Sequence, residues 1–478
     1  MVSSTAGHLP AGFPGSIGAV MRRRMTFAAF VAATVLAGAA APALASPAEP
    51  DAVPTPTMGW NSWNSGIPLN ENTIRETVDA MIASGMRDAG YRYINLDAGW
   101  AAPQRDSHGD LQADPDKFPH GIAALADYIH DRGMSLGLYS SPYNQTCGQT
   151  LATAGLGHED QDARQFATWG VDYLKYDWCR ADADHNEQVR VFTAMRDALR
   201  ATGRAVVYSI NPNSSEDTDA GTTYDWSQIA DLTRSTGDLI PLWRNDLPAT
   251  KIGDFDTRGF VGVMDEFATT IAHGSQTGRD PDMLVVGITM AEFLGAHTDG
   301  MPAMAAKQGA LSAEDAARLG TGFRISPQLL DLLRRQDSLT IAEQCAHFTL
   351  WAMLGAPLIA GNDVRTMSAE TRDILTNREV IAIDQDPTDA QGAALPDDHR
   401  IIVKPLGDGS VGVALFNDTD SPATIETTTA ATGLAPSERY RVRDPWAHTT
   451  TTTTGPITAH DIPPHGVVLV RVGPESSS

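Results

Sequence analysis

The chain has 478 residues, a formal net charge of −24, 42% hydrophobic residues and 20% charged residues. This composition is typical of a soluble globular protein, and the length exceeds that of one average domain. The excess of acidic side chains argues against a chain that binds nucleic acid or an anionic membrane through its charge.

The first 45 residues are expected to be a leader and not part of the fold. Arg22-Arg23-Arg24 precede an apolar run over residues 27–40, and Ala43-Leu44-Ala45 has the small-residue spacing of a cleavage site. The apolar run is too short to span a membrane. The sequence therefore predicts a secretory signal peptide over residues 1–45 and a secreted, extracellular protein.

Between residues 55 and 385, strand-like runs alternate with amphipathic helical patterns. Eight runs are expected as strands, at residues 58–60, 93–97, 135–139, 173–176, 205–209, 229–234, 283–286 and 357–360. Strands that alternate with helices build a parallel sheet, and eight of them close a ring. The pattern predicts an α/β fold, a (β/α)8 TIM barrel over residues 46–392, with an insertion near residues 288–340.

The pattern changes from about residue 393 onward. Short strand-like runs, separated by Gly, Asp and Pro turns, lie at residues 400–404, 411–416, 423–428, 439–442, 449–454 and 467–472. Strands of this length without intervening helices indicate a C-terminal antiparallel β-sandwich domain over residues 393–478.

Polar and aromatic residues gather where the barrel strands end. They are Trp60, Asp97, Tyr139, Lys175, Asp177, Asn211, Arg234, Asp238, Asp282 and Asp363. Taken singly, an Asp after a strand is an ordinary helix cap or turn residue. Because the carboxyl ends of all barrel strands meet on one face, so many such residues on one rim favour a binding or catalytic site.

Two of these carboxylates suit the cleavage of a glycosidic bond. Asp177 follows Lys175 by two positions, so both side chains project to the same side of a strand, and the cation is expected to lower the pKa of Asp177. Asp238 lies four residues after Arg234, across a turn. A retaining mechanism needs one carboxylate as nucleophile and one carboxylic acid as proton donor.

Several longer motifs resemble glycoside hydrolase family 27, the α-galactosidase or melibiase family. The resemblance covers nearly all of the chain after the leader. Its motifs are TMGWNSW at 57–63, QRD at 104–106, QADP at 112–115, FPHG at 118–121, GLY at 137–139, WGVDYLKYD at 169–177, DPDML at 280–284, APLIAGND at 356–363 and VIAIDQDP at 380–387.

The resemblance implies roles for these residues. Asp177 would be the nucleophile and Asp238 the acid and base. The residues implied to bind or line the substrate are Lys175, Arg234, Trp60, Tyr139, Asp97, Asn211 and Asp282. A disulfide between Cys147 and Cys179 is implied beside the site, which leaves Cys345 free. The resemblance implies neither a metal nor a cofactor.

Three positions depart from the family pattern and leave the sugar open. Ala98 replaces the second of two adjacent carboxylates after the second strand. Asn211 and Ser214 lie in a loop that often carries Glu and bulkier residues, and Thr233 replaces a Trp before Arg234. The leading interpretation is an α-galactosidase acting on α-galactosides. The alternatives are an α-N-acetylgalactosaminidase, a β-L-arabinopyranosidase, an isomalto-dextranase, or a catalytically silent carbohydrate-binding barrel.

Overall fold

The computed structural model describes residues 55–475, except 148–152, 181–183, 215, 247–250, 253–254, 257–259, 275–277, 299–336 and 389. The predicted leader over residues 1–45 and most of the predicted insertion at 288–340 lie outside the described residues. Within the described part of the chain, every helix is too short or too polar to cross a membrane.

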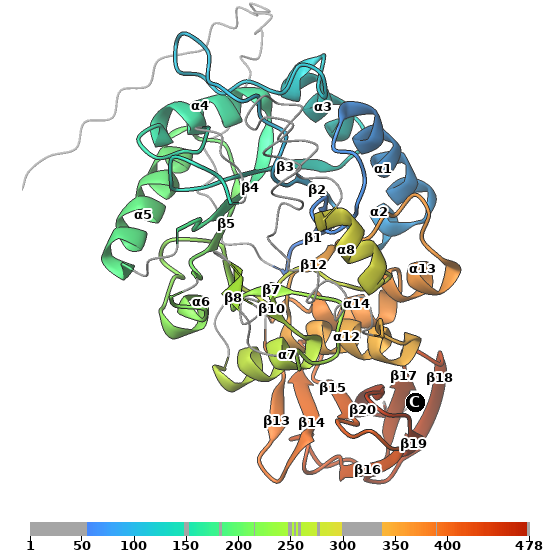
Figure 1. Cartoon of the computed structure of the whole chain (residues 1–478). Coiled ribbons are helices and arrows are strands. Elements are labelled where there is room, and N and C mark those ends of the chain that lie inside the picture. The colour runs from blue at the N-terminus through green and yellow to red at the C-terminus, as the bar shows by residue number, and fades with distance from the viewer. Residues whose placement is uncertain are drawn as a thin grey trace, which may run out of the picture. The chain divides into compact units, whose positions relative to one another are not determined.

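Eight parallel strands form the central sheet (Figure 1). In chain order they are β1 (Met58–Asn61), β2 (Tyr93–Leu96), β3 (Ser135–Ser140), β4 (Val171–Asp177), β5 (Val207–Asn211), β6 (Leu232–Arg234), β11 (Arg279–Asp280) and β12 (Leu358–Ala360). The sheet order is β11-β6-β5-β4-β3-β2-β1-β12. A parallel bridge between Leu284, just after β11, and Ala360 joins the two ends, so the sheet curls into a barrel.

Helices surround the strands, as Figure 1 shows for the first half of the barrel. The described helices are α1 (Glu71–Ala83), α2 (Met86–Ala89), α3 (Gly121–His130), α4 (Glu159–Trp169), α5 (His185–Ala201), α6 (Ala220–Thr223), α7 (Val263–Ala272), α8 (Met290–Thr298), α12 (Ile341–Leu354), α13 (Ala369–Leu375) and α14 (Arg378–Asp384). Capping boxes at Asn70 and Thr340 start α1 and α12, because these side chains satisfy backbone N–H groups of the first turn.

The predicted seventh strand is in the wrong place. Residues 283–286 were expected to form it, whereas the strand is β11, four residues earlier. Pro281 lacks the N–H group for a ladder, and Asp282 has a φ of 75°, which ends the strand. Part of the apolar run that follows still touches the barrel: Leu284 N donates to Ile359 O of β12 at 2.7 Å, and Val285 N donates to Nε2 of His347 in α12 at 3.2 Å.

An excursion of the chain separates β6 from α7. It contains β7 (Asp238–Leu239) and β10 (Phe260–Val261), which pair in parallel, and the short antiparallel pair β8 (Lys251–Ile252) and β9 (Phe255–Asp256). This excursion carries the candidate acid Asp238 at the start of β7.

The C-terminal domain consists of two antiparallel layers. The larger sheet has the order β13 (Ala393–Leu395), β14 (Asp398–Pro405), β15 (Val411–Phe416), β20 (Val467–Pro474), β17 (Tyr440–Asp444), β18 (Thr449–Thr453), and the smaller pairs β16 (Ala423–Thr428) with β19 (Pro456–Ile462). Val413 and Leu415 of the first layer share a core with Ile425 and Ile457 of the second. The sequence did not predict β13 and β19.

Helix α12 joins the barrel to this domain. Its residues from Ala346 to Leu354 are all buried, because α12 contacts barrel helices on one side and β14, β15 and β20 on the other. The fully buried Lys404 of β14 donates through Nζ to Ala352 O at 2.9 Å and Asp384 O at 3.3 Å. A cation is favoured there because the carbonyl groups at the ends of α12 and α14 carry partial negative charge.

The barrel wall at Gly59 is expected to reject any side chain. A Cβ there would lie 2.6 Å from Tyr93 O and 2.8 Å from Tyr93 Cβ, both on the neighbouring strand. Gly59→Ala should therefore lower the free energy of unfolding by about 1–3 kcal/mol, the usual effect of overpacking. Gly295→Ala is the matched control, because a Cβ in that helix meets nothing within 4 Å. Denaturant unfolding of both variants checks this, and equal stabilities would contradict it.

Candidate active site

A pocket with about 300 Å³ of empty space, counting its open mouth, lies at the carboxyl ends of the barrel strands. Four residues predicted from the sequence line it: Lys175, Arg234, Asp238 and Asp282. The other lining residues are Trp63, Asn64, Leu239, Phe260, Met283, Phe293 and His297. The pocket therefore has charged groups from β4, β6, β7 and the segment after β11, and an apolar, largely aromatic wall.

The buried ammonium group of Lys175 connects Asp177 to Asp97. Its Nζ lies 2.8 Å from Asp97 Oδ2 and 3.6 Å from Asp177 Oδ2. Asn61 Nδ2 also donates to Asp97 Oδ2, at 3.0 Å. Burial alone would lower the pKa of Lys175, but Asp177 and Asp97 raise it well above the ordinary value. Lys175 therefore stays charged between the two carboxylates.

Lys175 lowers the pKa of Asp177 as predicted, but burial, which the sequence did not predict, outweighs this effect. Burial raises the pKa of its carboxyl group to about 7, although Lys175 and Arg234 lower it, because Asp97 and Asp238 act in the same direction as burial. The closer partner of Lys175 is Asp97, and among the described residues none donates a hydrogen bond to Asp177 Oδ1. The carboxylate of Asp177 is thus desolvated and only partly compensated, as a reactive group would be.

Arg234 is the second buried cation and holds the other side of the pocket. One of its terminal nitrogens lies 3.0 Å from Asp282 Oδ2 and 3.2 Å from Asp238 Oδ1. It also donates to Gly237 O at 2.6 Å, so it ties Asp238 to the turn that precedes it. The side chain of Asp238 is 46% exposed, whereas that of Asp282 is 6% exposed. Both carboxylates line the pocket, but Asp238 is far more exposed to solvent than Asp282.

Asp280 and Asp282 are two further buried carboxylates near Arg234. Burial raises the pKa of Asp282, with Arg234 opposing and Asp238 adding to the shift. Burial likewise raises the pKa of Asp280 to about 6. Asp282 is held by backbone donors, since Met283 N lies 2.7 Å from its Oδ1 and Leu239 N lies 2.8 Å from its Oδ2. This places Asp282 as a link between β11 and β7.

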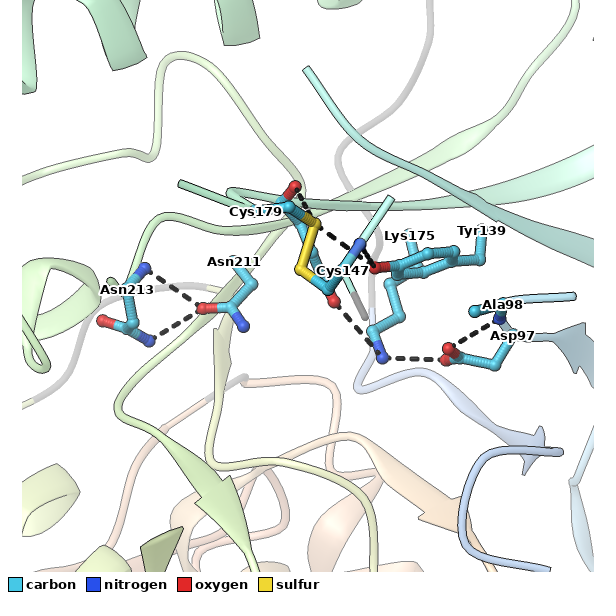
Figure 2. The surroundings of a disulfide bond; sticks show 9 residues. Asp97, Ala98, Tyr139, Cys147, Lys175, Cys179, Asn211 and Asn213 are labelled. Atoms are coloured by element: carbon cyan, nitrogen blue, oxygen red, sulfur yellow. Dashed lines mark hydrogen bonds and ion pairs between the residues drawn. A yellow bond between two sulfur atoms is a disulfide. The ribbon is translucent and has the colours of Figure 1, made fainter. Parts of the chain in front are cut away.

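The disulfide between Cys147 and Cys179 borders the cluster (Figure 2). Figure 2 shows Tyr139 beside this bridge, with Lys175 directed toward Asp97. The Tyr139 hydroxyl accepts from Cys147 N at 3.3 Å, and its ring centroid lies 5.3 Å from Lys175 Nζ. Burial and the nearby Asp177 raise the Tyr139 pKa well above its ordinary value, so the hydroxyl stays protonated. Cys345 is a free thiol.

Asn211 lies next to the nucleophile candidate but is already engaged. It pairs with Asp177 in the register of β4 and β5. Its Oδ1 accepts from Asn213 N at 3.1 Å and from Asn213 Nδ2 at 2.9 Å. Asp363, another rim candidate, pairs instead with Arg365 at 2.9 Å. Neither residue lines the described pocket.

Trp60, which was predicted to line the pocket, is the third residue of β1. Its side chain is fully buried in the barrel core, and its Nε1 donates to Asn362 O at 2.8 Å, so it does not line the pocket. Trp63 does, three residues later, because the chain turns out of β1 after Asn61 and Trp63 N donates to Asn61 Oδ1 at 2.8 Å. Both tryptophans belong to one motif, and spacing alone did not distinguish them.

The sequence also missed the aromatic wall on the acid side. Phe293 and His297 come from α8, inside the segment expected to be an insertion, and Phe260 comes from β10. The ring of His297 lies 4.3 Å from that of Phe293 and 5.1 Å from that of Trp63, measured between centroids. Their spacing of four residues in a helical segment was the available signal.

The described residues contain no group of three or more His, Cys, Asp or Glu side chains arranged to hold a metal ion. The charged side chains that line the pocket form ion pairs: Arg234 with Asp238 and Asp282, and Lys175 with Asp177 beside the pocket. A barrel whose strand ends present two carboxylates, each beside its own buried cation, defines a class of enzymes that cleave glycosidic bonds.

Comparison with known proteins agrees with this class. The family model described as alpha galactosidase A matches residues 55–295 and 316–386, and the alpha galactosidase C-terminal beta sandwich domain matches residues 396–472. The α-galactosidase of Cyamopsis tetragonoloba is 34% identical over 429 residues, which cover 88% of this chain and 87% of that protein. For α-galactosidase A of Cellvibrio japonicus the identity is 33%, covering 88% and 92%.

A solved structure gives the same result. Crystalline α-galactosidase I from Mortierella vinacea superposes with a TM-score of 0.69 at 30% identity, covering 89% of this chain and 98% of that one. The chain therefore belongs to the α-galactosidase family of glycoside hydrolases. The family model leaves residues 296–315 unmatched, and this stretch includes His297 of the aromatic wall.

The raised pKa of Asp177 predicts a pH-dependent gain of stability in Asp177→Asn. Between about pH 4 and pH 7 the folded protein keeps a proton on Asp177 that the unfolded chain releases, so this group lowers the stability of the native protein as the pH rises through that window. Asparagine removes the titration. The stability of Asp177→Asn relative to wild type should rise from pH 4 to pH 7 and then level off.

Thermal unfolding at pH 4, 5.5, 7 and 8 measures this trend. The control is Asp373→Asn, whose side chain is 69% exposed and should show no comparable trend. A stability difference that is flat with pH for Asp177→Asn would show that its carboxyl group titrates normally.

Proposed function

We propose that this member of the α-galactosidase family is a retaining α-galactosidase that removes terminal α-galactosyl residues, with Asp177 as nucleophile and Asp238 as acid and base. The observation that carries the proposal is the pairing of the two carboxylates with separate buried cations. Lys175 lies 3.6 Å from Asp177, and Arg234 lies 3.2 Å from Asp238. The two groups therefore have different surroundings, as different roles require.

In the first step, a carboxylate oxygen of Asp177 attacks the anomeric carbon of the galactosyl residue. The bond from that carbon to the leaving oxygen breaks, and Asp238 gives its proton to that oxygen. The products are a galactosyl ester on Asp177 and the free leaving group. In the second step, Asp238 takes a proton from water, the water oxygen attacks the anomeric carbon, and the ester bond to Asp177 breaks.

The surroundings of each carboxylate suit its proposed step. Asp177 attacks in its ionised form, which Lys175 and Arg234 favour, and it lacks a hydrogen bond to Oδ1 within the described residues, so little solvation has to be removed first. Asp238 is half-exposed at the mouth, where it can exchange a proton with a leaving group and then with water. Lys175, Arg234 and Asp282, which line the pocket, are proposed to contact sugar hydroxyls, together with Asp97, which lies 2.8 Å from Lys175 Nζ.

One observation favours a second candidate, an enzyme of the same family acting on a different sugar. Ala98 places a methyl group where the family pattern has a second carboxylate, and its N–H donates to Asp97 Oδ1 at 2.8 Å. Asp97 is then the single carboxylate at the end of β2. A β-L-arabinopyranoside or an α-N-acetylgalactosaminide would therefore be the alternative substrate.

We also propose that the chain is exported and that its leader is removed near Ala45. The basic, apolar and small-residue order of residues 22–45 supports this, and so does the disulfide, which needs an oxidising compartment. N-terminal sequencing of protein recovered from the culture medium tests it, and recovery of an uncleaved chain from the cytoplasm would refute it.

Substrates with different leaving groups should separate the roles of the two carboxylates. Asp177→Asn should lose at least on the order of 10³-fold in kcat on every substrate, because no ester can form. Asp238→Ala should lose on the order of 10²-fold or more in kcat/KM on melibiose but far less in kcat/KM on 4-nitrophenyl α-galactoside, whose leaving group departs without a proton, because kcat/KM reports the first step alone. Equal losses of Asp238→Ala on both substrates would place the acid elsewhere, and Asp246 would be tested next.

Ala98→Asp should reveal the sugar. If galactose is the natural sugar, the new carboxylate can form up to two charge-assisted hydrogen bonds, worth roughly 1.5–3 kcal/mol each, and kcat/KM on 4-nitrophenyl α-galactoside should rise. If another sugar is natural, kcat/KM on that sugar should fall, because the added carboxylate would be desolvated without a partner. A panel of 4-nitrophenyl α-galactoside, α-N-acetylgalactosaminide, β-L-arabinopyranoside and α-glucoside measures this. No change on any of them would show that residue 98 does not face the sugar.

A further inference from the structure

The turn that presents Asp238 is buried, although Asp238 itself is half-exposed. Ser235 and Thr236 are 0% and 6% exposed, and they connect β6 directly to Asp238 at the start of β7. Arg234 contacts Asp238 Oδ1 at 3.2 Å, and the backbone of residues 235–237 joins these two residues. Whatever holds this turn therefore also helps to orient Asp238.

The backbone of the turn is held by Asn213. Its Nδ2 donates to Thr236 O at 2.6 Å and to Arg234 O at 3.3 Å, while its Oδ1 accepts from Gly221 N at 3.0 Å. The backbone of α6 lies against the turn at Gly221, where a Cβ atom would be 1.7 Å from Arg234 O and therefore could not fit. The carbonyl groups of the turn are thus fixed from the side of β5 and α6.

The side chain of the turn is held from the opposite direction, by α7. Thr236 Oγ1 donates to Glu266 Oε2, and Thr270 Oγ1 donates to Glu266 Oε1 at 2.9 Å. Glu266 is completely buried. Burial raises its pKa to about 8, with Arg234 and the Thr270 hydrogen bond opposing. An apolar residue at position 266 would fill the same space without the cost of burying a carboxyl group. Packing therefore does not explain Glu266, whereas its hydrogen bond with Thr236 does.

We propose that Glu266 is a positioning residue for the proton-transfer steps: through Thr236 it fixes the turn at residues 235–237 and so directs Asp238 toward the leaving oxygen. The inference rests on the proposed role of Asp238. Glu266 does not touch the substrate. It acts by keeping Asp238 in reach of the leaving oxygen, and in the first step a small misplacement of Asp238 lowers the rate only for leaving groups that need a proton.

The test compares two isosteric variants, each of which removes one of the two threonine hydroxyls that donate to Glu266. Thr236→Val breaks the link to the turn, whereas Thr270→Val breaks a link within α7 and serves as the matched control. Thr236→Val should lower kcat/KM on melibiose by about tenfold or more and kcat/KM on 4-nitrophenyl α-galactoside by less than about threefold. Thr270→Val should change both rates by the same factor. Thr236→Ser, which restores the hydroxyl, should recover the wild-type ratio of the two rates.

A purely structural role for Glu266 would lower the rates on both substrates together, and that result in Thr236→Val would overturn the inference. Thr236→Ala repeats the test if the valine is not tolerated. In the Asp238→Ala background, Thr236→Val should add no leaving-group dependence, because the acid is already absent. If Asp238→Ala itself showed none, the proposed acid and this inference would both fall. If only Thr236→Val showed none, the inference alone would fall.

Discussion

The site depends on two cations that the barrel buries, Lys175 and Arg234. Each lies among carboxylates that would otherwise repel one another: Asp97 and Asp177 around Lys175, and Asp238, Asp280 and Asp282 around Arg234. Neither cation can lose its charge under ordinary conditions, because the carboxylates raise both pKa values although burial opposes this. A buried ion pair adds little net stability, but removing one partner is costly. The two cations therefore matter less for the stability of the fold than for allowing several carboxylates to lie close together in the site.

This balance is incomplete around Asp177, and the incompleteness has a chemical use. Lys175 is nearer to Asp97 than to Asp177, so the carboxylate of Asp177 is left desolvated with a pKa of about 7. A nucleophile that was fully paired and hydrogen-bonded would be more stable and less reactive. The barrel thus accepts a poorly solvated group at the end of β4, while Asp282, which follows β11 three strands away in the sheet, receives two backbone donors and a close arginine.

Much of the barrel could be predicted because its strands follow local rules. Alternating strands and helices, turn residues and family motifs located seven of the eight strands, and the side chains of β4 and β6 follow from them. The seventh strand was misplaced because the apolar run at 283–286 outweighed the shorter polar strand Arg279–Asp280. A pattern of hydrophobicity reports burial, and here the buried run makes a single bridge to β12, through Leu284, and a hydrogen bond to α12, without forming a strand of its own.

The site shows the same division between what is local and what is not. The positions of Lys175 and Asp177 on one face of β4 follow from the two-residue period of a strand. The pKa of Asp177 does not, because it depends on burial and on charges from three other elements. Trp60 and Trp63 could not be told apart before the path of the chain after β1 was known. The aromatic side chains of α8 were missed because their segment had been set aside as an insertion.

Helix α12 contacts both domains, so the C-terminal domain supports a helix that reaches the candidate active site. Trp351 of α12 donates through Nε1 to Asp282 O at 3.1 Å, and Lys404 of the sandwich holds the end of the same helix. The sandwich is therefore not a removable appendage. If the C-terminal domain were replaced by that of a relative, the new domain would need a lysine at the position of Lys404 to meet the end of α12. The sequences of the two domains are therefore expected to change together.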